Sequence, residues 1–194
     1  MFKQLRTALM ALAVLTVLTG VLYPLLVTGL STLAFAHQAG GSLIVANERV
    51  VGSSLIGQPF DEPKYFFSRL SATGPAPYNP SSSAGSNLGP TNPALRVAVQ
   101  ARVDALQALD PENHALIPID LVTSSASGLD PHISPAAAAY QAARVARVRG
   151  VPVERVNQLI ARHTNGGALA VFGEPAVNVL ELNLALDSLY PAAP

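Results

Sequence analysis

The hydrophobic residues of this chain follow two kinds of pattern. From Ala8 to Ala36 there are 29 residues without a charged side chain, and most of them are apolar. A helix of about 20 apolar residues is long enough to cross the hydrocarbon core of a bilayer. After residue 36, apolar residues recur at the shorter spacings of amphipathic helices and strands. The pattern predicts one membrane helix, residues 8–36, followed by one globular domain, residues 37–194.

The first half of the globular domain predicts two strand regions, a loop and a helix. Residues 42–58 are rich in β-branched side chains and predict a short strand or hairpin, and residues 65–67 predict a further strand. Residues 71–93 carry no charge and are rich in Ser, Pro and Gly. They predict a loop, either functional or disordered. Apolar residues at helical spacing follow, and Asn92 with Pro93 predicts where that helix begins.

The second half predicts a buried strand, a second polar loop and further helices. Residues 115–122 are mostly apolar and predict a strand, at a sheet edge because Pro118 has no backbone N–H. Residues 123–135 predict the second polar loop. Three more predictions are a helix capped by Ser134 and ending at Gly150, a helix beginning at Pro152, and a strand followed by a helix over 176–189. Because strands and helices are interspersed, the predicted fold class is α+β or α/β.

The apolar segment has two interpretations. Lys3 and Arg6 precede it, and Ala34-Phe35-Ala36 resembles a signal-peptide cleavage site, so a cleaved signal is one alternative. The apolar core of a signal is only about 7–15 residues long, which favours a retained anchor here. Pro24 removes one backbone hydrogen bond and predicts a kink in this helix.

The charges on either side of the segment predict its orientation. Both charges before it are positive, whereas the first charges after it, Glu48 and Arg49, cancel. The positive-inside rule therefore predicts that residues 1–7 are cytoplasmic and that the globular domain is extracytoplasmic. This describes a single-pass protein of the cell membrane.

Composition narrows the classes of function. Of 194 residues, 49% are hydrophobic and 12% are charged, with twelve Lys and Arg against twelve Asp and Glu. This hydrophobicity excludes a disordered chain, and the lack of a basic excess argues against nucleic-acid binding. The chain has no Cys, which excludes a disulfide framework and thiolate chemistry.

A search for catalytic motifs leaves one alternative open. The chain has neither the Gly-x4-Gly-Lys-Ser/Thr phosphate loop nor the Gly-x-Ser-x-Gly nucleophile elbow. The residue types of a serine hydrolase do occur in the second polar loop: Ser124, Ser125, Asp130 and His132. Triad members seldom come from one short segment. A membrane-anchored extracytoplasmic hydrolase using residues 123–135 remains the alternative function.

Metal binding is the other chemistry that this loop could offer. Asp130 and His132 are possible ligands, but Asp130 also suits a turn before Pro131, so we interpret the pair as fixing its loop. The remaining histidines are scattered along the chain: His37, His114 and His163. Three arginines end the helix before Gly150 and face the negative end of its dipole: Arg144, Arg147 and Arg149.

Long stretches of the chain resemble one known family. The segments are SNLGPTNP at 86–93 and DLVTSSASGLDPHISP at 120–135, with further matches at 23–25, 138–150 and 177–187. They are similar to the C subunit of the bacterial high-affinity potassium-transporting ATPase, the KdpC family. Three positions depart from the family pattern: Phe67 stands where Trp is usual, Leu70 where Pro is usual, and Asn165 where an acidic residue often stands.

The resemblance implies an accessory, non-catalytic subunit of an ATP-driven potassium import complex in the bacterial inner membrane. The implied partners are a channel-like potassium-binding subunit and a P-type ATPase subunit. The resemblance also implies a catalytic chaperone that raises the ATP affinity of the ATPase subunit. Because the predicted topology separates the domain from cytoplasmic ATP, we expect that effect to be allosteric, through the membrane helix.

The sequence points to no residue for a catalytic step, a metal or a cofactor, and ATP and potassium are expected to be handled by the complex. Polar side chains in Gly- and Ser-rich loops can bond backbone groups and hold the loops in place. The predicted interface or loop-fixing residues are therefore Asn87, Asn92, Asp120, Asp130 and His132.

Overall fold

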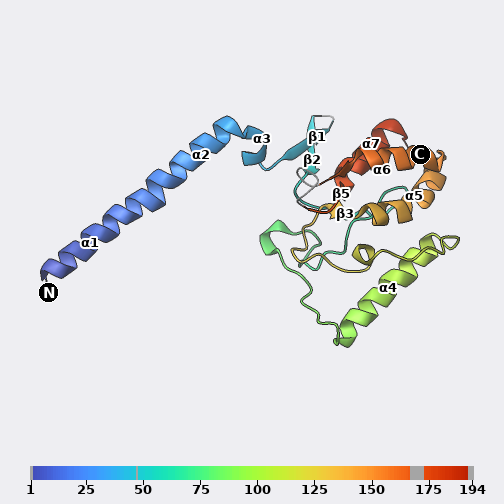
Figure 1. The fold of residues 1–194 in the computed structure, drawn as a ribbon, viewed down its shortest axis with the longest axis horizontal. Helices are drawn as coiled ribbons and strands as arrows, with labels where there is room; N and C mark the ends of the chain where they lie inside the picture. The colour runs from blue at the N-terminus through green and yellow to red at the C-terminus, as the bar shows by residue number, and fades with distance from the viewer. Residues whose placement is uncertain (1, 47, 167–172, 192–194) are drawn as a thin grey trace. The chain divides into compact units, whose positions relative to one another are not determined.

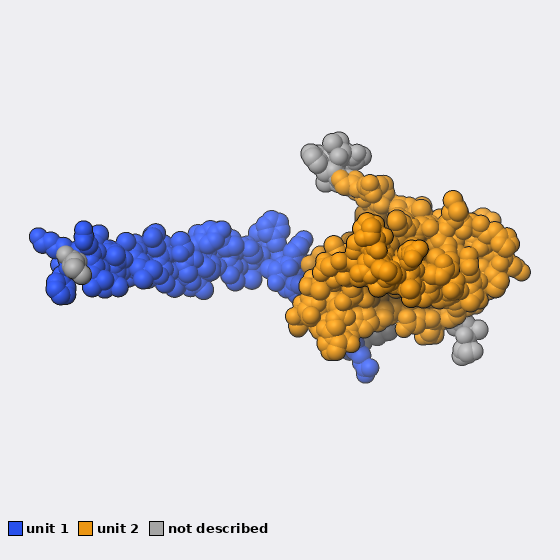
Figure 2. All heavy atoms as spheres, turned by 90° about the horizontal axis from the view of Figure 1, so that it is seen from below, with its two compact units in different colours: residues 1–51 blue, residues 52–194 orange. Residues whose placement is uncertain are grey.

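The computed structural model describes residues 2–46, 48–166 and 173–191 of the chain. The chain divides into two compact units, residues 1–51 and residues 52–194, which Figure 2 shows in different colours.

Unit 1 is built on one long apolar helix (Figure 1). Helix α1 (Phe2–Val17), a π-helical turn η1 (Leu18–Leu22) and helix α2 (Tyr23–Ala34) follow one another without a break. Together they have 33 residues, a stretch of 18 residues with a mean hydropathy of 2.2, and no buried residue. By length and composition this helix can cross a membrane. It ends two residues before the predicted boundary because Phe35, with φ −137° and ψ 48°, leaves the helical conformation.

The π-helical turn lies directly before Pro24. A proline inside a helix has no N–H to donate, and its ring crowds the carbonyl four residues earlier, here that of Gly20. Single π-turns are a common accommodation of such a disturbance. The kink predicted at Pro24 stays a prediction, but the local change of helix type occurs beside it.

The predicted hairpin spans the end of unit 1 and the first two residues of unit 2. A short helix α3 (Ala36–Ala39) precedes strands β1 (Leu43–Ala46) and β2 (Arg49–Ser53), which pair as a two-stranded sheet. The prediction of a hairpin within residues 42–58 is confirmed.

Unit 2 has a small antiparallel sheet at its centre. Strand β5 (Ala176–Asn178) lies between β3 (His132–Ile133) and β4 (Thr164–Asn165), with Val177 opposite both Ile133 and Thr164. Among the described residues of unit 2, helices α4 (Pro93–Leu109), α5 (Pro135–Arg149), α6 (Val153–Arg162) and α7 (Val179–Leu189) accompany the sheet. The 3-10 turns η2 (Pro80–Ser82) and η3 (Ile119–Leu121) lie in the same unit. Because the sheet is antiparallel, the fold class of this unit is α+β rather than parallel α/β.

Side-chain caps explain where the helices begin. The Asn92 side chain accepts a hydrogen bond from Ala94 N at 3.0 Å, and Ser134 Oγ accepts one from Ala137 N at 3.0 Å. Each cap satisfies a backbone N–H that the first helical turn leaves unpaired. Helix α5 ends at Gly150, whose φ of +66° suits a residue without a Cβ. The predicted starts of both helices are confirmed.

The core of unit 2 lies where α5, α6 and α7 meet β3 and β5. Figure 1 shows these three helices gathered beside the two strands, with α4 on another side of the unit. The side chains without solvent exposure include those of Phe66, Leu121, Val145, Val156, Val177, Val179, Leu182 and Leu186. Helix α4 buries only Leu106, so it is less covered than α5, α6 and α7.

The strand predicted at residues 65–67 is wrong, because two side-chain amides take the place of a neighbouring strand. Phe66 N donates to Asn183 Oδ1 at 2.9 Å, and Phe66 O accepts from Asn183 Nδ2 at 3.0 Å. Phe67 makes the same two bonds with Gln141, at 2.8 and 3.2 Å. We call Gln141 and Asn183 the amide pair. They satisfy a buried backbone that has no strand beside it.

The strand predicted at residues 115–122 is also wrong. Pro118 cannot donate to a sheet, and the chain turns after it through η3, where Leu121 N donates to Pro118 O at 3.1 Å. Leu121 is buried, but Leu116 and Ile119 are 95% and 75% exposed. The apolar run therefore reflects a turn with outward apolar side chains rather than a buried strand.

The arginines at the end of α5 do more than face the helix dipole. Arg144 Nη1 donates to the carbonyls of Pro63 and Tyr65, and the guanidinium stacks 4.3 Å from the Phe67 ring centroid. Burial lowers the pKa of Arg144 to about 10. Arg149 donates to Lys64 O at 2.8 Å. Both arginines therefore hold residues 63–65, which directly precede the two phenylalanines that the amide pair bonds.

Candidate functional site

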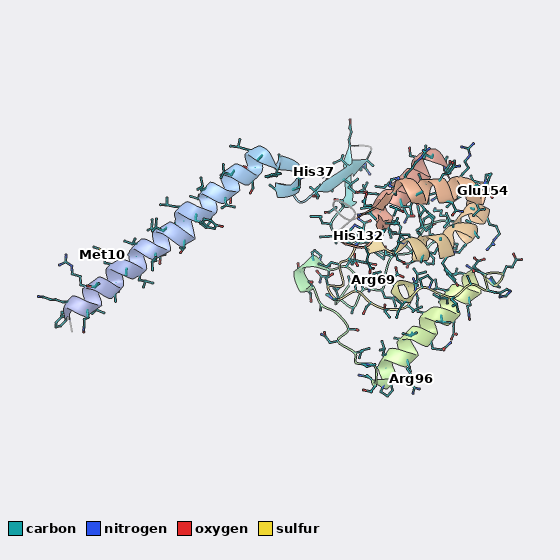
Figure 3. All side chains as sticks on the ribbon, in the orientation of Figure 1. Met10, His37, Arg69, Arg96, His132 and Glu154 are labelled. Carbon is teal, nitrogen blue, oxygen red and sulfur yellow. The ribbon has the colours of Figure 1, made fainter. Side chains whose placement is uncertain are left out.

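Three charged or titratable side chains meet beside the second polar loop. Asp130 Oδ2 lies 3.2 Å from Arg69 Nη1, and Asp130 Oδ1 lies 3.4 Å from His132 Nδ1. Asp130 Oδ1 also accepts from the backbone N–H of His132 at 3.0 Å. We call Arg69, Asp130 and His132 the charged cluster, and Figure 3 shows Arg69 and His132 in the same part of unit 2. The cluster joins the segment after Phe67 to the start of β3.

The contacts of Asp130 hold it in its charged form. Partial burial of the carboxyl raises its pKa, but hydrogen bonds from His132 and Arg69 outweigh burial, so the pKa of Asp130 lies below its ordinary value. Arg69 Nη2 also donates to Ser124 O at 3.4 Å. One guanidinium thus contacts both a carboxylate and a loop carbonyl.

The two polar loops hold each other. Ser71 Oγ donates to Gly128 O at 2.7 Å, and Ser83 Oγ donates to Ser127 O at 2.9 Å. A backbone bond from Ala84 N to Ser127 O, 3.0 Å, lies beside them. We call residues 71–85 and 123–131 the loop pair. These bonds join the two loops directly to one another.

Two glycines allow the loop pair to approach closely. A Cβ on Gly85 would lie 2.7 Å from Ala126 O, and one on Gly128 would lie 2.6 Å from Ala84 O. Gly128 also has a φ of +68°, a conformation that side chains disfavour. The glycines of these segments therefore allow the two loops to pack closely. Residues 71–85 are thus held against residues 123–131, whereas the disordered alternative for residues 71–93 predicts no such packing.

Asp120 acts on the start of helix α5. Its Oδ2 accepts from Ser134 N at 2.7 Å, and its Oδ1 lies 3.3 Å from Ser134 Oγ. Ser134 in turn caps α5, so Asp120 orients the capping residue. Asp120, Asp130 and His132 line one hollow of about 510 Å³, together with Arg69 and Glu174.

The other two predicted site residues lie elsewhere. Asn92 is the exposed cap of α4, and Asn87 is exposed with a φ of +52°. Asn tolerates this left-handed conformation better than most residues. Neither lines the hollow that holds Asp120, Asp130 and His132. The interface role predicted for these five residues stays a prediction.

The hydrolase alternative finds no support in this geometry. Ser125 is 3% exposed, and its backbone N–H donates to Leu70 O at 3.1 Å. Within residues 48–166, no hydrogen bond joins the hydroxyl of Ser124 or Ser125 to His132. A carboxylate and an imidazole therefore lie together without the nucleophile contact that a triad requires. Among the described residues, no three His, Asp or Glu side chains gather as metal ligands.

Sequence reasoning missed Arg69 and the amide pair. Arg69 follows Phe67, so the bonds between Phe67 and Gln141 place it near Asp130. One available signal was Gln141 itself, an uncharged polar residue in an otherwise alanine-rich helix. An amide among small apolar residues often bonds a buried backbone.

The fold and the charged cluster together define a small protein with one potential membrane helix and one α+β domain whose polar residues hold its own loops. The family model for the c chain of K⁺-transporting ATPases, KdpC, matches residues 5–188. The chain therefore belongs to the KdpC family, which confirms the resemblance.

Curated relatives agree over nearly the full length. A potassium-transporting ATPase KdpC subunit of Polaromonas naphthalenivorans is 64% identical over 187 residues, which is 96% of this chain and 95% of the relative. The corresponding subunit of Ralstonia nicotianae is 63% identical over 95% of this chain and 91% of the relative. That of Sorangium cellulosum is 62% identical over 96% of this chain and 98% of the relative.

Proposed function

We propose that this chain is a non-catalytic accessory subunit of a high-affinity, ATP-driven potassium import complex in the bacterial inner membrane. Its partners are a channel-like potassium-binding subunit and a P-type ATPase subunit. The observation that carries this proposal is the match of residues 5–188 to the KdpC family, on a chain with one apolar helix of 33 residues. The names of the relatives describe them as subunits of a potassium-transporting ATPase.

The chain has its N-terminus in the cytoplasm and its folded domain outside. Lys3 and Arg6 support this orientation, because cations are retained on the cytoplasmic side. The apolar helix is a retained anchor rather than a cleaved signal. An intact mass that includes residues 1–36 in the purified membrane protein tests the retention directly.

The orientation is tested by labelling, which the Cys-free chain makes simple. Ser86→Cys introduces a thiol at an exposed position of the domain, and Gln4→Cys introduces one before the apolar helix. We expect an impermeant maleimide to label Ser86→Cys in intact cells and to label Gln4→Cys only after lysis. The reverse result would place the domain in the cytoplasm and overturn the orientation.

The chain also acts as a catalytic chaperone that raises the ATP affinity of the ATPase subunit. With the domain outside, this coupling passes through the membrane helix and has a typical allosteric size of about 1–3 kcal/mol. The test compares the KM for ATP of the complex carrying the full chain with that of a complex whose residues 2–34 are replaced by an unrelated apolar helix. An unchanged KM would contradict coupling through this helix.

Assembly itself is tested by affinity purification of the tagged full chain in mild detergent. We expect the channel-like and P-type ATPase subunits to be recovered with it in a fixed ratio. A chain that is recovered alone, although folded, would contradict the accessory-subunit proposal.

A further inference from the structure

An open groove runs along one side of helix α5. Its floor is a stripe of exposed small residues, Ala136, Ala139 and Ala143, which share one face of the helix. The loop after α4, which carries Leu116 and Pro118, forms a wall beside this floor. This part of the groove has a volume of about 630 Å³, and in Figure 1 the loop after α4 returns alongside α5.

The groove continues beyond this loop. Pro118 and Ala136 also line the hollow of about 510 Å³ that holds the charged cluster, so the two spaces lie side by side. From Ala136 to Arg147 the floor extends for about 17 Å at the helical rise. An elongated segment fits this shape better than a small molecule does.

The lip of the groove is unusually apolar. Leu116 and Ile119 are 95% and 75% exposed, more than any other large apolar side chain described in unit 2. Contiguous apolar surface of this kind marks an interaction site when it adjoins a concave space.

Tyr140 lines the same groove, and its buried hydroxyl has no hydrogen-bond partner among the described residues. A buried hydroxyl without a hydrogen-bond partner is uncommon in native proteins.

The charged residues that line the groove favour a cationic occupant. Five carboxylates line the two neighbouring spaces, against two guanidinium groups. Glu112 and Glu174 form no ion pair with another described residue, and they lie in different halves of the groove. A negative rim repels anionic lipid headgroups and attracts a cationic segment.

We infer that this groove is the docking site for a segment of another subunit of the same complex, apolar along its middle and carrying Lys or Arg near its ends. The inference rests on the proposed function, because that function supplies the partner. Leu116 and Ile119 contact the apolar middle of the segment, and Glu112 and Glu174 contact its cations. The alanine floor lets the backbone of the segment approach α5 closely.

Photo-cross-linking in the assembled complex tests the contact. The full chain contains no Cys, so Leu116→Cys can carry a benzophenone maleimide at one defined position. Val97→Cys is the matched control, because Val97 is 69% exposed in the same unit and does not line the groove. We expect Leu116→Cys to give a cross-linked peptide of another subunit with the stated composition, and Val97→Cys to give none with that peptide.

The outcomes separate the inference from the function on which it rests. A cross-link from Leu116→Cys only to lipid or only to a second copy of this chain would overturn the inference, as would no cross-link in an intact complex. If the unmodified chain recovers no other subunit at all, the proposed function itself fails.

A second measurement uses charge. The double variant Leu116→Asp, Ile119→Asp should reduce the affinity for the complex about tenfold or more, the usual size when central contacts of an interface are lost. Val97→Asp should leave it unchanged. Equal melting temperatures of both variants show that they fold, and equal affinities of the two would contradict the inference.

Discussion

The amide pair and the loop pair both hold irregular backbone in place, but they do so in different surroundings. Gln141 and Asn183 are fully buried and bond the N–H and C=O of Phe66 and Phe67. The loop pair is held by serine hydroxyls and by the charged cluster, which are largely half-exposed. In the first region water cannot replace a lost partner, and in the second region it can. Burial, rather than the number of bonds, should therefore decide what each contact contributes to stability.

The largest effect is expected where the amide pair is broken. Asn183→Ala leaves the N–H and C=O of Phe66 unpaired in a fully buried place, and should lower the free energy of unfolding by about 3 kcal/mol. Asn157→Ala makes the same change at an exposed position of helix α6 and should stay within about 0.5 kcal/mol of the parent. Denaturant unfolding of the full chain in detergent measures both. Equal stabilities of the two variants would contradict the role of the amide pair.

The next effect concerns the close approach within the loop pair. Gly128 and Gly150 have nearly the same φ, +68° and +66°, but only Gly128 has neighbours at Cβ distance. Gly150→Ala should cost about 1 kcal/mol, the conformational penalty alone. Gly128→Ala should cost about 2–3 kcal/mol, because the added methyl also displaces Ala84 and Thr73. If thermal melting shows the same loss for both, the loops are not packed as described.

A smaller effect is expected in the charged cluster. Asp130→Asn removes a half-exposed charge and should cost about 1 kcal/mol at pH 7. Because the folded-state pKa lies below its ordinary value, the contribution of Asp130 is present above about pH 4 and is lost as the pH falls through the lower, folded-state value. Unfolding measured from pH 6 to pH 2 should therefore show a weaker acid destabilisation in Asp130→Asn than in the parent.

Asp61→Asn serves as the control for this pH dependence, because Asp61 is exposed and lies outside the cluster. Its loss of stability as the pH falls should match that of the parent chain.

Asp130→Ala should also reduce recovery of the partner subunits in affinity purification while leaving membrane insertion intact. Normal recovery would show that this cluster is not needed for assembly.

An effect of similar size is expected at the start of helix α5. Ser134→Ala removes the cap, and Asp120→Ala removes the carboxylate that orients it, so each should cost about 1 kcal/mol. Because both act through one cap, the double variant should lose less than the two single losses added together. Additive losses would show that Asp120 acts independently of Ser134.

The sequence by itself determined the apolar helix, the capped helices and the family. These features depend on local information: the length of an apolar run, and the Asn-Pro and Ser-Pro pairs that begin α4 and α5. The family is identified from motifs that can be read directly in the amino-acid sequence. The same local signals failed at residues 65–67 and 115–122, where an apolar run predicts a strand in both cases.

Only the tertiary structure decided how those two segments are held. The backbone of Phe66 bonds a side chain 117 residues further along the chain, and that of Phe67 bonds one 74 residues further along, so no local pattern contains either pairing. The charged cluster joins residues 61 positions apart for the same reason. A side-chain partner for buried backbone is chosen by packing, because only the packed fold decides which polar groups lie within hydrogen-bond distance of the buried N–H and C=O.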